Sequence, residues 1–164
     1  MNKICKNIFF CAILCFCLTG CSPKIQDHSA PITKTYKYFE IPDVILVHNK
    51  GKDKKITNKD SLYNEILDLT NQRFSNKIDY YELAIEMNKL KNFEKNEIVL
   101  EFIYKDSKQT KYDENGTFSR KYKKLIMPLT GKYTNCVFFD TGDNSSYGPI
   151  ATLSSPDSLI KILK

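Results

Sequence analysis

Residues 97–104 read Glu-Ile-Val-Leu-Glu-Phe-Ile-Tyr. Every second side chain, at Ile98, Leu100, Phe102 and Tyr104, is apolar or aromatic, and the set between them includes two glutamates. Consecutive side chains of a strand point to opposite faces, so this alternation predicts a strand with one buried face.

Further strands are predicted after residue 104. Residues 105–108 are expected to turn the chain, and Asn115-Gly116 supplies the positive φ that a tight hairpin turn needs. The predicted strands are residues 109–112, 118–122, 124–129, 133–140 and 147–153. Short connections of this kind join antiparallel neighbours, so we expect an antiparallel sheet.

One strand is predicted ahead of residue 97. Residues 36–48 are rich in β-branched and aromatic side chains, and Pro42 indicates an edge strand, a bulge or a break. Residues 51–55 are expected to turn the chain after this strand.

Three helices are predicted. Thr57-Asn58-Lys59-Asp60 has the spacing of a capping box, and apolar residues follow it at helical intervals up to Phe74. Residues 79–93 fit either a helix or an alternating strand, and their strong helix formers favour the helix. Ser155 and Pro156 predict the start of a short C-terminal helix.

This order of elements predicts an α+β domain over residues 35–164, with a single antiparallel sheet of about five to six strands and two or three helices packed on one face. The 164 residues suffice for one domain of ordinary size and are too few for two. Five of the six cysteines lie in the first 21 residues, which excludes a disulfide-rich scaffold.

The first 20 residues differ in composition from the rest. Lys3 and Lys6 are followed by eleven apolar residues at positions 8–18 and by the small residues Thr19 and Gly20. Eleven residues rise only about 16 Å as a helix, well short of the roughly 30 Å hydrocarbon core of a bilayer. We therefore expect residues 1–20 to be a cleaved secretory signal peptide.

Leu18-Thr19-Gly20-Cys21 resembles the lipobox of bacterial lipoproteins, in which the cysteine sulfur receives a diacylglycerol and the chain is cut just before it. The resemblance implies that Cys21 is the lipidation site and anchors the mature chain to the extracytoplasmic face of the cell membrane. Residues 21–34 would then contain this cysteine and a flexible tether of up to about 45 Å. The excess of lysine over arginine is typical of an AT-rich genome, and the order of elements resembles that of small Gram-positive lipoproteins.

Two residues are candidates for catalysis. Residues 137–142 are similar to the hydrophobic-hydrophobic-Asp-Thr-Gly motif of aspartic proteases, with Asp140 as the aspartate. That chemistry needs two such aspartates, and the sequence contains one copy of the motif. This favours the alternative of a strand that runs into a turn. Cys136 is the one thiol left in the mature domain, and core packing is favoured over a nucleophile pair with His48. No ligand spacing typical of a zinc or calcium site is present, so no cofactor is expected.

Charge is the remaining functional signal. Basic residues are predicted to gather around one hairpin, and these are Lys105, Lys108, Lys111, Arg120, Lys121, Lys123 and Lys124. A second cluster consists of Lys50, Lys52, Lys54 and Lys55. Anionic lipid headgroups, wall polymers or acidic proteins would be the partners in reach, and nucleic acid is not expected there. The alternative is that these lysines form an ordinary solvated surface without a partner. The small net charge of the mature chain favours this alternative, because loss of Lys3 and Lys6 with the signal peptide lowers the formal net charge from +6 to +4.

These observations predict a membrane-anchored lipoprotein of the cell envelope whose domain is a non-enzymatic binding module for an envelope protein or an anionic polymer. The alternative is a small envelope hydrolase that uses Asp140 or Cys136. A third possibility is a structural or inhibitory role through the edge of the sheet. A concave pocket that gathers titratable groups would favour the enzyme.

Overall fold

The computed structural model describes residues 34–36, 38–74, 79–80, 85, 87–109, 121–140, 149–151 and 153–164. The strands in this part of the chain are β1 (Val44–Asn49), β2 (Lys52–Ile56), β3 (Asp79–Tyr80), β4 (Ile98–Gln109), β5 (Lys121–Pro128), β6 (Cys136–Asp140) and β7 (Pro149–Ala151). The helices are α2 (Leu62–Arg73), α3 (Met87–Asn96) and α4 (Asp157–Leu163).

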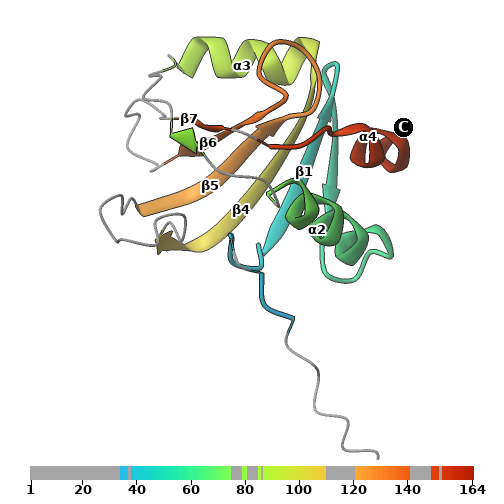
Figure 1. The fold of residues 1–164 in the computed structure, drawn as a ribbon. Coiled ribbons are helices and arrows are strands. Elements are labelled where there is room, and N and C mark those ends of the chain that lie inside the picture. The colour runs from blue at the N-terminus through green and yellow to red at the C-terminus, as the bar shows by residue number, and fades with distance from the viewer. Residues whose placement is uncertain are drawn as a thin grey trace, which may run out of the picture. The chain divides into compact units, whose positions relative to one another are not determined.

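The seven strands form one sheet in the order β2-β1-β4-β5-β6-β7-β3, and every neighbouring pair is antiparallel (Figure 1). β4 contains the alternating residues 98–104 and pairs with both β1 and β5. The predicted α+β fold with a single antiparallel sheet is confirmed. The strands β2 and β3 bring the number above the predicted five to six, because they occupy segments for which a turn and a helix were predicted.

β4 is longer than predicted. Residues 105–108 do not turn the chain but continue the strand as far as Gln109. The pairing with β5 is irregular between Ile103 and Lys108 and then resumes with Lys108 opposite Tyr122. A bulge of this kind absorbs extra residues without reversing the chain, which explains the wrong prediction. The predicted Asn115-Gly116 turn lies outside the described residues.

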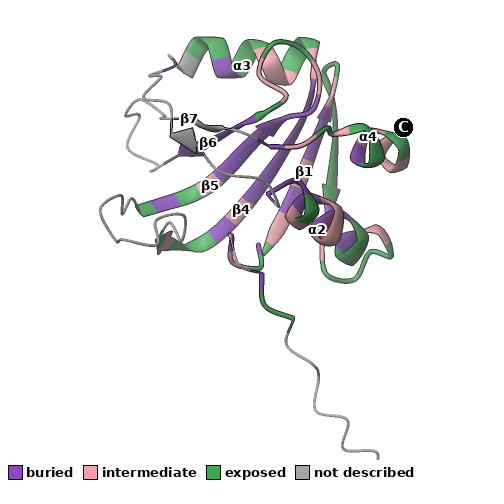
Figure 2. Cartoon of the chain, in the orientation of Figure 1, coloured by how far each residue is buried: buried purple, intermediate pink, exposed green. Residues whose placement is uncertain are grey.

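The main hydrophobic core lies on the face of the sheet covered by α2 and α4 (Figures 1 and 2). Fully buried side chains from both layers meet there, among them Phe102, Leu125 and Phe139 of the sheet and Ile66 and Leu67 of α2. The predicted helix is confirmed as α2, but the expected capping box lies ahead of it. The Asp60 carboxylate accepts a hydrogen bond from the Thr57 N–H at 2.7 Å, whereas the residue before the helix is Ser61, whose side chain makes no capping hydrogen bond. Two helices on one face agree with the prediction.

The third helix, α3, packs on the opposite face of the sheet. Leu90 of α3 lies in a second cluster with Val99, Ile126 and Phe138. These strand residues alternate with members of the main core, so they point to the other side of the sheet. The sheet therefore has helices on both of its faces.

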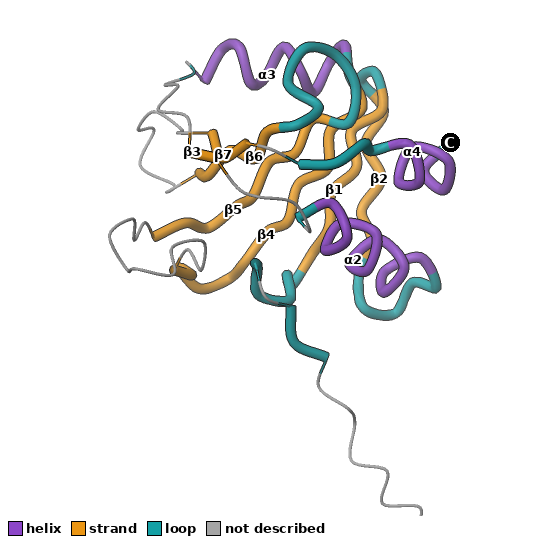
Figure 3. The backbone as a smooth tube through the Cα atoms, viewed as in Figure 1, coloured by secondary structure: helices purple, strands orange, loops and turns teal. Residues whose placement is uncertain are grey.

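The prediction of a helix over residues 79–93 was wrong in its bounds. Residues 79–80 form β3, which pairs with β7 (Figure 3), and the helix begins at Met87 and continues to Asn96. Ile85 is buried in the second cluster. At residues 79–80, pairing with β7 outweighs the helix prediction.

The predicted turn at residues 51–55 was also too long. Lys50 and Gly51, with φ of 51° and 81°, reverse the chain, and β2 starts at Lys52. β2 is an edge strand whose first four residues are exposed and include three lysines (Figure 2). This polar segment forms a strand by pairing with β1, and its exposed lysines oppose pairing with other chains at the sheet edge.

Candidate functional site

A row of charged side chains crosses the face of the sheet on which α3 packs. His48 of β1, Glu101 of β4, Lys124 of β5 and Asp140 of β6 belong to this row. His48, Glu101 and Asp140 are only 7%, 4% and 8% exposed. Lys124 Nζ lies 3.7 Å from Glu101 Oε2 and 4.0 Å from Asp140 Oδ2. Buried charges are costly unless paired, and these pairs link β4, β5 and β6.

His48 is held from two sides. Its Nδ1 atom lies 2.8 Å from Asp53 Oδ1 on β2, and its Nε2 atom lies 3.7 Å from Glu101 Oε1. The second distance is too long for a hydrogen bond, and Nε2 has no hydrogen-bond partner among the described residues. Interaction with Glu101, and less strongly with Asp53, raises the pKa of His48 to about 9 although burial acts in the opposite direction. His48 is therefore positively charged at neutral pH.

Glu94 of α3 reaches the same place from the other layer. Its side chain is half-buried, and one ligand atom each of His48, Glu94 and Glu101 lies within 4.8 Å of the others. Burial, followed by the negative charge of Glu101, raises the pKa of Glu94. Burial would also raise the pKa of Glu101, but His48 and Lys124 together lower it. The two carboxyl groups thus differ in their affinity for a proton.

Sequence reasoning missed this group. Glu101 was expected only as a member of the less apolar face of its strand, and His48 was considered as a partner of Cys136. Glu101, in the middle of the otherwise apolar residues 98–104, could have indicated the group from the sequence, because a buried carboxylate requires a partner. Its partners are distant in sequence and meet only through the register of β1 with β4.

The two residues of the hydrolase alternative do not form a catalytic group with each other or with His48. Cys136 is 7% exposed and packs in the second cluster, and burial raises the pKa of its thiol, which opposes formation of a nucleophilic thiolate. His48 contacts Asp53 and Glu101 instead of Cys136. Asp140 lies near the Lys124 ammonium group, whereas the protease mechanism requires a second aspartate at that distance.

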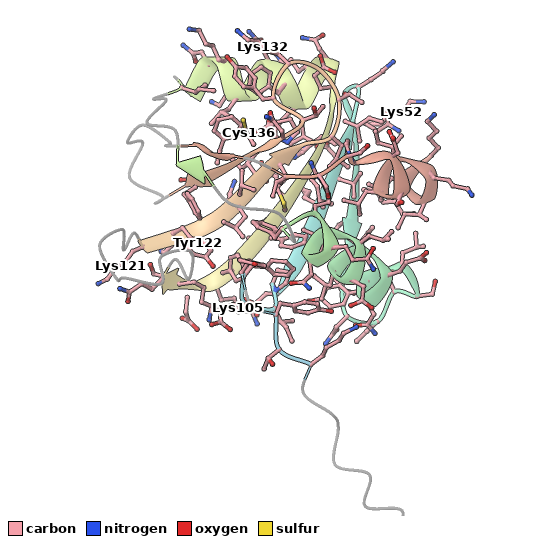
Figure 4. All side chains as sticks on the ribbon, in the orientation of Figure 1. Lys52, Lys105, Lys121, Tyr122, Lys132 and Cys136 are labelled. Carbon is pink, nitrogen blue, oxygen red and sulfur yellow. The ribbon has the colours of Figure 1, made fainter. Side chains whose placement is uncertain are left out.

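The predicted basic patch is divided by the structure. Lys124 pairs with Glu101 and Asp140, and the exposed Lys105 lies 3.9 Å from Asp43. Lys121 and Lys123 are exposed on β5, and the half-exposed Lys108 lies on the paired segment of β4. Lys111 and Arg120 lie outside the described residues. Figure 4 shows Lys105 and Lys121 toward one end of the sheet and Lys52 toward the other, so the two predicted clusters are separate.

A pocket of about 250 Å³ lies beside the C-terminal end of α2. Its lining includes Arg73, Ser154 and Ser158. Arg73 is 3% exposed and donates from Nε to the Ser154 carbonyl at 3.1 Å and from Nη2 to the Thr134 carbonyl. These bonds tie α2 to the segments before β6 and α4. Burial lowers the pKa of Arg73 to about 10, so the guanidinium remains charged at neutral pH.

Comparison with protein families, with curated proteins and with solved structures gives no match. In the described part of the chain, no helix is long and apolar enough to cross a membrane. Cys21 and the residues around it lie outside the described part, so the lipobox prediction is carried by the sequence.

Proposed function

We propose that this protein is a lipoprotein anchored through Cys21 to the extracytoplasmic face of the cell membrane, and that its α+β domain is a non-enzymatic binding module. The observation that carries the proposal is the sequence Leu18-Thr19-Gly20-Cys21 at the end of an eleven-residue apolar run. Two acyl chains on one cysteine give a stable membrane anchor at about 0.8 kcal/mol for each buried methylene group.

The position of the folded domain supports the proposal. Residues 34–164 form one compact unit with its own hydrophobic core, so the domain begins 13 residues after Cys21. A tether of that length separates a folded module from a lipid anchor without burying either.

The exposed lysines near the end of β4 and β5 favour an anionic partner. Glu40 and Asp43, in the segment before β1, contact this end of the sheet, because the Lys105 N–H donates to Asp43 at 2.8 Å and the Tyr104 hydroxyl donates to the Glu40 carbonyl at 2.9 Å. The lysines at this end are Lys105, Lys108, Lys121 and Lys123. Phosphate groups, whether of lipids or of wall polymers, match this charge.

Anchoring is tested by membrane fractionation of the full chain with radiolabelled fatty acid. Cys21→Ala is expected to abolish the label and to reduce the amount of protein in the membrane fraction. Cys17→Ala is the matched control, because Cys17 lies within the apolar run and is expected to leave labelling unchanged. A labelled Cys21→Ala protein would refute the anchor.

The anionic partner is tested with the domain of residues 34–164, which has its own hydrophobic core, and vesicles that contain or lack anionic lipid. A lysine near such a surface contributes about 1 kcal/mol, so Lys121→Glu with Lys123→Glu is expected to weaken binding by about tenfold or more, and added salt is expected to weaken it further. Lys52→Glu with Lys54→Glu, at the other end of the sheet, is the control. A phosphate-rich wall polymer replaces the vesicles in a parallel experiment. Salt-independent binding, or equal losses in both double variants, would reject this partner.

A further inference from the structure

We propose that His48, Glu94 and Glu101 form a binding site for a divalent transition-metal cation, with Zn²⁺ as the ion that best fits the donors. The three side chains come from β1, α3 and β4, and one ligand atom of each lies within 4.8 Å of the others. The proposal does not depend on the lipid anchor or on the exposed lysines Lys121 and Lys123.

The unpartnered nitrogen of His48 is the first argument. The imidazole is more than nine-tenths buried, and its Nε2 atom faces Glu101 Oε1 at 3.7 Å without a hydrogen-bond partner among the described residues. This nitrogen lies within ion-pair distance of Glu101 but makes no hydrogen bond within the described part of the chain, which is unfavourable for a buried polar group. A cation between Nε2 and the carboxylate would satisfy both groups.

The orientation of the ring is the second argument. Asp53 lies 2.8 Å from Nδ1, so this nitrogen carries the hydrogen of a bond to the carboxylate and Nε2 is the atom that faces the site. Metal-binding histidines are commonly held by such a carboxylate on the far side of the ring. Asp53 is therefore a positioning residue for this site.

The spacing and charge of the donors fit a four-coordinate ion. Ligand atoms at about 2.1 Å from zinc lie about 3.4 Å from one another, so the three side chains need to approach by little more than 1 Å. Glu94 is half-buried on a helix surface and has the freedom to move by this amount. Two carboxylates balance the two charges of the ion, and the proton on Nε2 passes to solvent when zinc binds.

Neighbouring groups leave room for this arrangement. Lys124 Nζ lies 3.7 Å from Glu101 Oε2, the oxygen that does not face His48. Lys124 also lies 4.0 Å from Asp140, so the Lys124 ammonium group keeps a carboxylate partner when Glu101 turns toward a metal ion. One imidazole with two carboxylates favours zinc over magnesium or calcium, which select oxygen ligands alone. A fourth position would be open to water.

The test is isothermal titration of the untagged full-length protein in detergent with Zn²⁺, after treatment with a chelator. We expect one zinc ion per chain and no binding of Mg²⁺. Glu94→Gln and Asp53→Asn are each expected to weaken binding by about tenfold or more. Glu65→Gln, an exposed glutamate of α2, is the matched control and should change nothing.

His48→Gln should remove the site, and thermal unfolding shows whether this buried variant remains folded. If it does not, the half-exposed Glu94→Gln decides the question. The absorption spectrum of the Co²⁺ complex should show nitrogen and oxygen ligands without a band from Cys136 thiolate. Absence of stoichiometric zinc binding, a thiolate band, or unchanged affinity of the Glu94→Gln protein would overturn the proposal. None of these outcomes bears on the anchor, which fatty-acid labelling tests separately.

Discussion

Gly51 and Gly131 have almost the same positive φ, 81° and 79°, in different surroundings. A Cβ atom at Gly51 would meet only the Lys95 carbonyl oxygen, at 3.8 Å. A Cβ atom at Gly131 would lie 2.7 Å from Glu97 Oε1. That carboxylate accepts a hydrogen bond from the Thr130 hydroxyl at 2.5 Å, and the same hydroxyl oxygen accepts one from the Ile98 N–H at 2.8 Å. Gly131 therefore keeps space open for the contact that fixes the start of β4.

We predict different costs for alanine at these two positions. Gly51→Ala should lower the free energy of unfolding by about 1 kcal/mol, the strain of a left-handed residue with a side chain. Gly131→Ala should cost about 1–2 kcal/mol more, because it also displaces Glu97 from Thr130. Urea denaturation monitored by circular dichroism measures both values. Equal losses would show that the Glu97–Thr130 contact does not contribute.

At the scale of elements, α3 covers its face of the sheet through few side chains. Leu90 is 1% exposed and packs in the second cluster, whereas its neighbour Lys91 is exposed. Leu90→Ala is expected to lower the free energy of unfolding by about 2–5 kcal/mol, because it leaves a cavity over Val99, Ile126 and Phe138. Lys91→Ala should change it by no more than about 0.5 kcal/mol. Similar values for the two variants in denaturant titrations would mean that α3 does not pack as described.

The elements also show what sequence reasoning can reach. The strand β4 was predictable from the alternation of residues 98–104, and α2 was predictable from its helical spacing. The prediction that β4 has one buried face was wrong, because α3 packs on the other face and Val99 and Glu101 are buried there. The bounds of α3 and the strand β3 were not, because pairing with β7 and burial of Ile85 are tertiary effects. The group of His48, Glu94 and Glu101 depends on the register of β1 with β4 and on the side of the sheet that α3 covers. A local sequence pattern specifies neither the register of two strands nor the side of the sheet on which a helix packs.

At the scale of the whole molecule, the chain has a short N-terminal segment with the composition of a signal and a domain that is independent of it. Cleavage before Cys21 would leave one lipid-bearing cysteine and one core thiol, Cys136, which is the free cysteine of the described residues. The proposed anchor rests on four contiguous residues that resemble a lipobox, whereas the partner of the proposed binding module leaves no contiguous pattern in the sequence. That Cys21 carries a lipid anchor is the central proposal.

Mass spectrometry of the N-terminal peptide, from protein extracted from the membrane fraction, tests this claim most directly. The predicted result is a chain that begins at Cys21 and carries the mass of a diacylglycerol on that residue. An N-terminus at any other residue, or an unmodified Cys21, would contradict it.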